Sequence, residues 1–171
     1  MDHLHIREEI PEDGAAVRQI NERAFERPDE ARLVRALHEA KAVLLSLVAL
    51  LGEKAVGHIL FSPVTLEGCD HLPAGAGLAP MAILPEYQRR GIGSRLVTTG
   101  LEGCRKLGLD YAVVLGHPNY YPRFGFAAAS SFALSCAYPV PDEVFMARAL
   151  RPDGLKDHRG RVQYHEVFNQ L

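Results

Sequence analysis

The segment that most constrains the fold joins a predicted strand to a long predicted helix through two glycines. It reads Gln88-Arg89-Arg90-Gly91-Ile92-Gly93-Ser94. The residues before it, 78–84, form a short apolar run, and residues 91–108 after it carry apolar side chains at helical spacing. A strand, a tight turn and an amphipathic helix in this order indicate helices packed on a sheet.

The rest of the pattern extends this unit to a mixed α/β domain with a run of antiparallel strands before the main helix. The 171 residues, 47% of them hydrophobic, predict a single domain over 1–171, with a core at about 3–150 and a C-terminal extension at 151–171. Helices are expected to begin at Pro11 and Pro28 and to cover 91–108, with a short helix or turn at 118–124. Strands are expected over 4–10, 43–51, 55–66, 78–84, 111–115, 126–134 and 143–150, with one more near Val162.

Composition and charge argue against several classes of protein. Lys and Arg number 19 against 21 for Asp and Glu, so the net charge of −2 gives no support for nucleic-acid binding. The longest apolar stretch, 43–51, is too short to span a membrane, and the first residues lack the pattern of a signal peptide. Three widely spaced cysteines and scattered histidines predict reduced thiols in the cytoplasm and no metal site.

The glycine-containing turn predicts an anion site. Glycine lets the backbone turn tightly, and the first amides of the following helix have no intrahelical acceptor. Together with the helix dipole these amides favour a group such as a pyrophosphate, and Arg89 and Arg90 add charge-assisted donors. The competing interpretation is a plain turn with two solvated arginines. Other phosphate loops fit less well, because Leu96 replaces the third glycine of the dinucleotide fingerprint and Ser94-Arg95 replaces the Walker Lys-Ser/Thr pair.

Three motifs resemble those of the GNAT (GCN5-related) N-acetyltransferase superfamily. The segment 88–93, QRRGIG, resembles its acetyl-CoA signature Q/R-x-x-G-x-G/A, and the residues 81–87 resemble the strand that leads into it. The segment 121–126, YPRFGF, resembles the family ending Y-x-x-x-G-F. The spacing agrees over 78–126, and the run from Gly116 to Phe126 is most similar to a bacterial branch of N-acetyltransferases with unassigned substrates.

The resemblance implies the fold, the cofactor and the reaction. The fold would be a mixed, mostly antiparallel sheet flanked by helices, with acetyl-CoA in a gap between two splayed parallel strands, 81–83 and 112–115. The pantetheine arm would pair with the first strand at Met81, Ala82 and Ile83, and the pyrophosphate would bind the amides from Arg89 to Ser94. An amine of a small molecule or peptide would then attack the thioester directly.

The resemblance also suggests which residues move protons. Tyr121 is the candidate general acid for the departing thiolate, because a phenol with a pKa near 10 keeps its proton at neutral pH. Tyr120 is the rival, and a tyrosine buried in the core is the alternative reading. The candidates for the general base are His117, at the end of a predicted strand, and Glu67, Asp70 and His71 in an earlier loop. The alternative reading of His117 is that it only holds the turn. A proton relay through solvent would need no dedicated residue.

One family motif is missing. Many members carry Asn-x-x-Ala seven residues before the tyrosine, where this chain has Val114. Asn119, two residues before Tyr121, is the remaining candidate for a cofactor contact.

Two other functions and the oligomeric state stay open at this point. The chain could be a non-catalytic acyl-CoA-binding module that senses or recruits, or a phosphotransferase with an unusual loop, although no acidic metal-binding set supports the latter. A homodimer is expected if the apolar strand 43–51 lies at a sheet edge.

Overall fold

The structure, a computed structural model, describes residues 3–69 and 74–170 in two compact units. The first unit takes Met1–Phe61, Pro80–Gly100 and Glu166–Leu171, and the second takes Ser62–Ala79 and Leu101–His165. Strands β3 (Lys54–Leu66) and β4 (Gly75–Ile83) and helix α3 (Ile92–Lys106) contribute residues to both.

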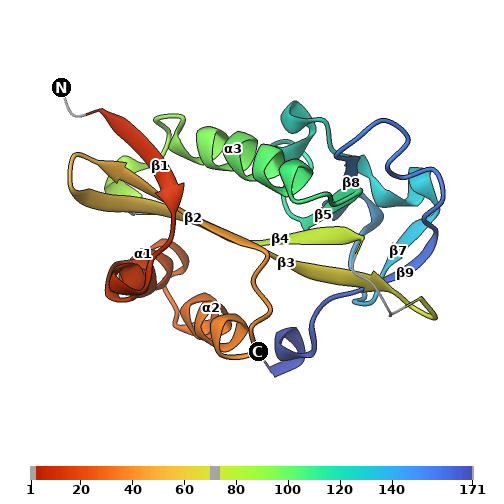
Figure 1. The fold of residues 1–171 in the computed structure, drawn as a ribbon, viewed down its shortest axis with the longest axis horizontal. Coiled ribbons are helices and arrows are strands. Elements are labelled where there is room, and N and C mark those ends of the chain that lie inside the picture. The colour runs from red at the N-terminus through yellow and green to blue at the C-terminus, as the bar shows by residue number, and fades with distance from the viewer. Residues whose placement is uncertain (1–2, 70–73, 171) are drawn as a thin grey trace. The chain divides into compact units, whose positions relative to one another are not determined.

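The first unit is built on antiparallel strands. Strand β1 (Leu4–Glu8) pairs with β2 (Leu45–Leu51), which pairs with β3 in the predicted hairpin, whose turn is Gly52-Glu53. Between β1 and β2 the chain forms a 3-10 turn, η1 (Pro11–Asp13), and helices α1 (Gly14–Phe25) and α2 (Asp29–Glu39). In Figure 1 these two helices lie on one side of β1 and β2, and the start of α3 lies on the other.

Alternation along β3 explains these layers, because successive side chains of a strand point to opposite faces. Leu60 joins the buried cluster formed with Val17, Leu33 and Leu37 of α1 and α2. Phe61 faces the other way, against Gly100 of α3, where its ring occupies the space that a larger side chain would need. Both faces of the middle of this strand are therefore covered, and residues 56–62 are all buried.

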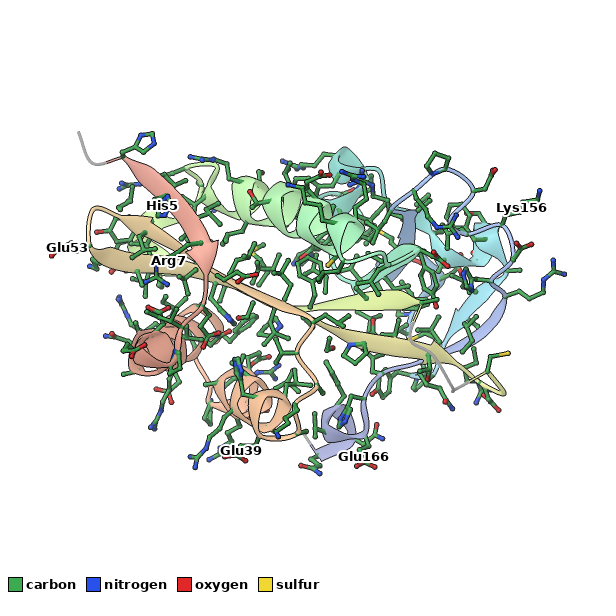
Figure 2. The ribbon with its side chains drawn as sticks, in the orientation of Figure 1. His5, Arg7, Glu39, Glu53, Lys156 and Glu166 are labelled. Carbon is green, nitrogen blue, oxygen red and sulfur yellow. The ribbon has the colours of Figure 1, made fainter. Side chains whose placement is uncertain are left out.

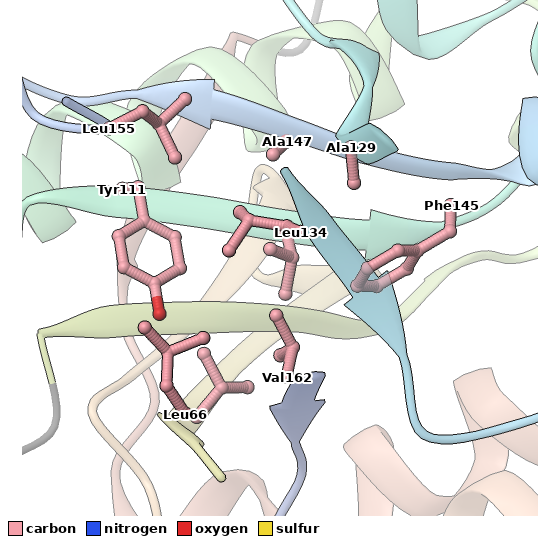
Figure 3. Packing of buried hydrophobic residues seen from close by; sticks show 10 residues of the cluster. Leu66, Tyr111, Ala129, Leu134, Phe145, Ala147, Leu155 and Val162 are labelled. Carbon is pink, nitrogen blue, oxygen red and sulfur yellow. The ribbon is translucent and has the colours of Figure 1, made fainter. Parts of the chain in front are cut away.

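The second unit is built around β5 (Tyr111–Leu115). This strand runs parallel to β4 and antiparallel to β8 (Phe145–Ala149), which also pairs with β6 (Ala127–Ala128). In the C-terminal part, β9 (Gly160–Gln163) pairs with the end of β3 and with β7 (Leu134–Cys136). Figure 3 shows the buried side chains that these strands enclose: Leu66, Tyr111, Ala129, Leu134, Phe145, Ala147, Leu155 and Val162.

The helices form where the sequence predicts them. Gly108 follows α3 in the left-handed conformation (φ 87°), as expected of a glycine that ends a helix. In the described part of the chain, no helix is both long enough and apolar enough to cross a membrane.

Two strand predictions and one inference drawn from them are corrected. The predicted strand 126–134 is broken into β6, a 3-10 turn, η4 (Ala129–Phe132), and β7. The strand expected at 78–84 begins earlier, at Gly75. Strand β2 pairs on both sides, so it is not an edge and gives no argument for a homodimer.

The packing of α3 on β3 predicts opposite effects for two Gly→Ala substitutions. A Cβ at Gly100 would lie 2.3 Å from the ring of the fully buried Phe61, whereas a Cβ at Gly14 in α1 meets nothing within 4 Å. We expect Gly100→Ala to lower the free energy of unfolding by about 1–3 kcal/mol. The control Gly14→Ala should raise it by about 0.5–1 kcal/mol. Urea unfolding at 25 °C measures both, and equal effects would contradict the packing described.

Candidate active site

The turn between β4 and α3 has the geometry that its glycines predict. After β4 the chain forms a 3-10 turn, η2 (Pro85–Tyr87), and then adopts the left-handed conformation twice, at Arg89 (φ 63°) and Gly91 (φ 81°). The Gln88 side chain amide donates to the carbonyl of Ile83 over 3.0 Å, which ties the turn to the end of the strand. Nothing lies within 4 Å of a Cβ built on Gly91, so this side of the turn is open.

Helix α3 points its first amides toward the same turn. The first backbone hydrogen bond of the helix runs from Arg95 N–H to the carbonyl of Gly91 over 3.2 Å. The N–H groups of Ile92, Gly93 and Ser94 precede that bond and therefore have no acceptor one turn earlier. Three such amides and the positive end of a 15-residue helix are suited to an anionic group.

Basic side chains surround the turn. Arg89 and Arg90 are exposed. The Arg90 guanidinium lies 5.2 Å from the centre of the Tyr87 ring, and the Lys54 ammonium lies 5.1 Å from the centre of the same ring. Both contacts are cation–π interactions. They hold two of the cations beside the turn without neutralising their charge.

The turn is also fixed to α1. Arg23 donates two hydrogen bonds of 2.8 Å to the carboxylate of Glu86, which lies in η2. A bidentate pair of this kind restricts orientation as well as distance. The position of the turn within the first unit thus depends on α1 as well as on β4.

The second part of β4 holds the three residues expected beside the pantetheine arm. The pairing between β4 and β5 ends at Leu78 and Val114, and Pro80, two residues further on in β4, has no N–H to donate. Met81 is partly exposed, whereas Ala82 and Ile83 are buried. The carbonyl of Ile83 already accepts the Gln88 bond, so part of the expected pairing capacity at this residue is in use.

Tyr121 lies in the second unit, at the start of a 3-10 turn, η3 (Tyr121–Phe124). Its side chain is 8% exposed and packs edge-on against Phe126, with ring centres 5.9 Å apart. A Cβ at Gly116 would lie 2.3 Å from the Tyr121 ring, so the close approach requires a glycine there. Burial raises the pKa of Tyr121 to about 12, and its phenol stays protonated at neutral pH.

The neighbouring candidates are more exposed than Tyr121. The carbonyl of His117 accepts the N–H groups of Tyr120 and Tyr121 over 3.0 and 3.3 Å, while the residue as a whole is exposed. Asn119 is also exposed, and its carbonyl accepts a bond from Arg123. His117 therefore shapes the turn through its main chain and leaves its ring accessible, a combination consistent with both readings of its role.

Of the other acidic and basic candidates, Glu67 lies within the described residues. Glu67 is exposed and forms an ion pair with Arg161 at 3.4 Å, and Asp70 and His71 lie outside the described residues. Within 3–69 and 74–170, no group of three His, Cys, Asp or Glu side chains is arranged to hold a metal ion.

Comparison with known proteins identifies the family. The family described as Acetyltransferase (GNAT) family matches residues 14–126. The chain belongs to this family. It is 37% identical over 167 residues to the uncharacterized N-acetyltransferase YhbS of Escherichia coli K12, a match that covers 97% of this chain and 99% of that protein. It is also 43% identical over 134 residues to the uncharacterized N-acetyltransferase YjhQ of the same organism, covering 77% and 74% of the two chains.

Solved structures of this GNAT family include two close matches. The crystal structure of E. coli YhbS in complex with CoA superposes with a TM-score of 0.93 at 36% identity, covering 99% of this chain and 93% of that one. A GNAT acetyltransferase from Brucella melitensis in complex with acetyl-CoA has a TM-score of 0.82 at 38% identity, covering 98% and 99%. The mixed sheet with flanking helices is thus the fold of this family.

One group of polar residues in this GNAT chain escaped the sequence analysis. His58 is completely buried on the face of β3 that α1 and α2 cover. Its Nδ1 lies 3.2 Å from the Asn21 side chain amide, and its Nε2 lies 2.9 Å from Ser46 Oγ, which donates to the Glu9 carboxylate over 2.5 Å. The only sequence signal was a histidine at an inward position of an apolar strand.

The hydrogen bonds fix the protonation state of this network. Asn21 Nδ2 can only donate, so Nδ1 of His58 accepts and Nε2 carries the proton. Burial lowers the pKa of His58 and outweighs the nearby Glu9 carboxylate, so the ring stays neutral. Burial opposes ionisation of Glu9, but hydrogen bonds from His58 and Ser46 outweigh it and lower the pKa of Glu9 below its usual range.

The buried His58 predicts that acid weakens the fold. Since its pKa is depressed in the folded state, the unfolded chain takes up a proton as the pH falls below about 6.5, and the folded chain does not. We expect the free energy of unfolding to drop by about 1.4 kcal/mol between pH 7.5 and 5.5 from this residue. Urea unfolding at the two pH values of wild type and His58→Gln measures it. The variant should lose that part of the pH dependence, and an unchanged slope would contradict the assignment.

Proposed function

We propose that this protein is an acetyl-CoA-dependent N-acetyltransferase that transfers the acetyl group directly to a primary amine of a small molecule or peptide. The observation that carries the proposal is the open turn at Gly91, where three helix amides and flanking cations face outward. The similarity to two structures solved with CoA and with acetyl-CoA supports the choice of cofactor.

In this proposal the turn holds the pyrophosphate. The amides from Arg89 to Ser94 donate to the phosphoryl oxygens, and Arg89 and Arg90 add charge from the rim. Gln88 keeps the turn in register with β4 through its bond to Ile83. Met81, Ala82 and Ile83 offer the main-chain edge for the pantetheine arm, and Asn119 is a further candidate for a cofactor contact.

The chemistry requires two proton movements. The neutral amine attacks the thioester carbonyl carbon, so that a C–N bond forms and the C–S bond breaks. The nitrogen must lose a proton, and the departing thiolate must gain one.

We assign the second proton to Tyr121. A phenol whose pKa is raised to about 12 is fully protonated at neutral pH, so it can hydrogen-bond to the thiolate as the C–S bond breaks and pass its proton to the sulfur. The close packing against Gly116 and Phe126 restricts the ring to one orientation. For the first proton we propose the exposed ring of His117 or a relay through solvent.

We also propose a cellular compartment and an oligomeric state for the enzyme. The free cysteines Cys69, Cys104 and Cys136 are consistent with a cytoplasmic protein, where thiols stay reduced. We also propose a homodimer, although the apolar strand β2 pairs on both sides and gives this proposal no support.

Placing a carboxylate on the turn should remove cofactor binding. We expect Gly91→Asp to weaken the affinity for CoA by at least about 100-fold, because it strains the left-handed turn and puts a negative charge at the pyrophosphate. Gly108→Asp is the matched control, with the same left-handed backbone and the same open surroundings at the other end of α3. Calorimetric titration with CoA measures both. Wild-type affinity in Gly91→Asp would exclude this site.

Removing the phenol should slow chemistry and spare binding. We expect Tyr121→Phe to lower kcat by about 10²–10⁴-fold, the usual contribution of a positioned acid, with CoA affinity nearly unchanged. Tyr120→Phe, one residue away, is the control and should keep its rate. Thiol release over a panel of amines reports the rate. No turnover of any amine by the wild type would instead favour a non-catalytic acyl-CoA sensor, and an unchanged rate in Tyr121→Phe would remove its role.

A further inference from the structure

A cavity lies in the first unit, between the β1–α1 connection and helices α1 and α2. Its volume is about 720 Å³, which is within the range of small-molecule sites. Its apolar lining includes Ile10, Val17, Ala31 and Val34. Ile10 is 45% exposed, so its side chain is accessible to a molecule in the cavity.

The cavity lining includes a buried carboxylate, Glu9, beside a histidine, His38. Glu9 and His38 both line it, and the Glu9 side chain is only 9% exposed. Oε1 of Glu9 accepts from Ser46 and lies 3.2 Å from His38 Nε2 and 3.4 Å from His58 Nε2. Among the described residues, no hydrogen bond or ion pair involves the second carboxylate oxygen.

No arginine in the cavity lining balances Glu9. Arg18 is paired with Glu22 at 2.8 Å, and Arg35 is paired with Glu39 at 2.9 Å. Glu39 lies on the solvent side at the end of α2 (Figure 2). Arg32 also lines the cavity and is exposed. Among the described residues, the buried Glu9 carboxylate is partnered at one oxygen by Ser46, His38 and His58 and by no arginine or lysine, so its other oxygen can accept a hydrogen bond from a cationic ligand.

The cavity is separate from the strand proposed to carry the thioester. The Glu9 N–H, just after β1, donates to the carbonyl of Ser46 in β2. In the sheet, β2 and β3 lie between β1 and β4. The Glu9 carboxylate reaches from the end of β1 toward β3, where its Oε1 lies 3.4 Å from Nε2 of His58. The residues that line the cavity include none of those proposed to hold the thioester or the pyrophosphate.

We propose that this cavity binds a small organic ammonium ion with an apolar body, its ammonium on the free oxygen of Glu9 and its body against Val17, Ala31 and Val34. The bound molecule replaces the water that would otherwise cover Ile10, and its ammonium supplies a positively charged partner for the Glu9 carboxylate. This binding does not depend on acetyl-CoA or on the proposed reaction. The proposal of an ammonium site and the proposal of acetyl transfer can therefore fail independently.

Calorimetric titration of the full chain, without CoA, tests the proposal with phenethylamine as the probe. We expect saturable binding at least about tenfold tighter than that of 2-phenylethanol or 3-phenylpropionate, which have the same phenethyl body without the ammonium. The resonance of the His38 ring should shift during the titration, because this ring lines the cavity. Equal binding of the three probes, or no shift of that resonance, would overturn the proposal.

Two variants and a control place the site. Glu9→Gln keeps an acceptor for Ser46 but removes the charge, and should weaken phenethylamine binding about tenfold. Ala31→Leu fills the cavity and should do the same with Glu9 intact, which keeps the test decisive if Glu9→Gln unfolds. Glu12→Gln removes an exposed carboxylate outside the cavity lining and should change nothing. Wild-type affinity in a folded Ala31→Leu variant would exclude the cavity.

Discussion

The left-handed backbone at Arg89 and Gly91 is the constraint on which the candidate active site depends. It lets the chain leave β4 and enter α3 with the first helix amides facing outward. Glycine adopts this conformation without strain, whereas an arginine in it costs about 1–3 kcal/mol, which the surrounding contacts must offset. The Gln88–Ile83 bond and the Arg23–Glu86 pair are two such contacts.

Local signals predicted much of the fold. Strand β5 was predicted at 111–115, where the structure has it, because a short apolar run follows a glycine-terminated helix. The prediction of one strand over 126–134 was wrong because the alanines and serines of this segment suit several conformations. There the Ser131 hydroxyl donates to the carbonyl of Ala128, and Ala133 turns left-handed, so the chain forms a 3-10 turn.

The site was predictable only where its residues are close in the sequence. The turn at 88–94 is a continuous motif, so its glycines predicted the tight turn that the structure has, and the pyrophosphate site there is our proposal. Asn21 and His58 are 37 residues apart, and only the packing of α1 on β3 brings them together. In the same way, the position of β2 between two strands depends on pairing partners that its own apolar pattern does not specify.

A titration of the ¹⁵N-labelled protein with CoA, followed through the backbone amide resonances, tests the central claim most directly. Pantetheine, which lacks the pyrophosphate, is the comparison ligand. If the helix amides bind the pyrophosphate, CoA shifts the resonances of Gly91–Ser94 downfield and pantetheine leaves them in place. Equal shifts with both ligands, or CoA shifts confined to other residues, would contradict it.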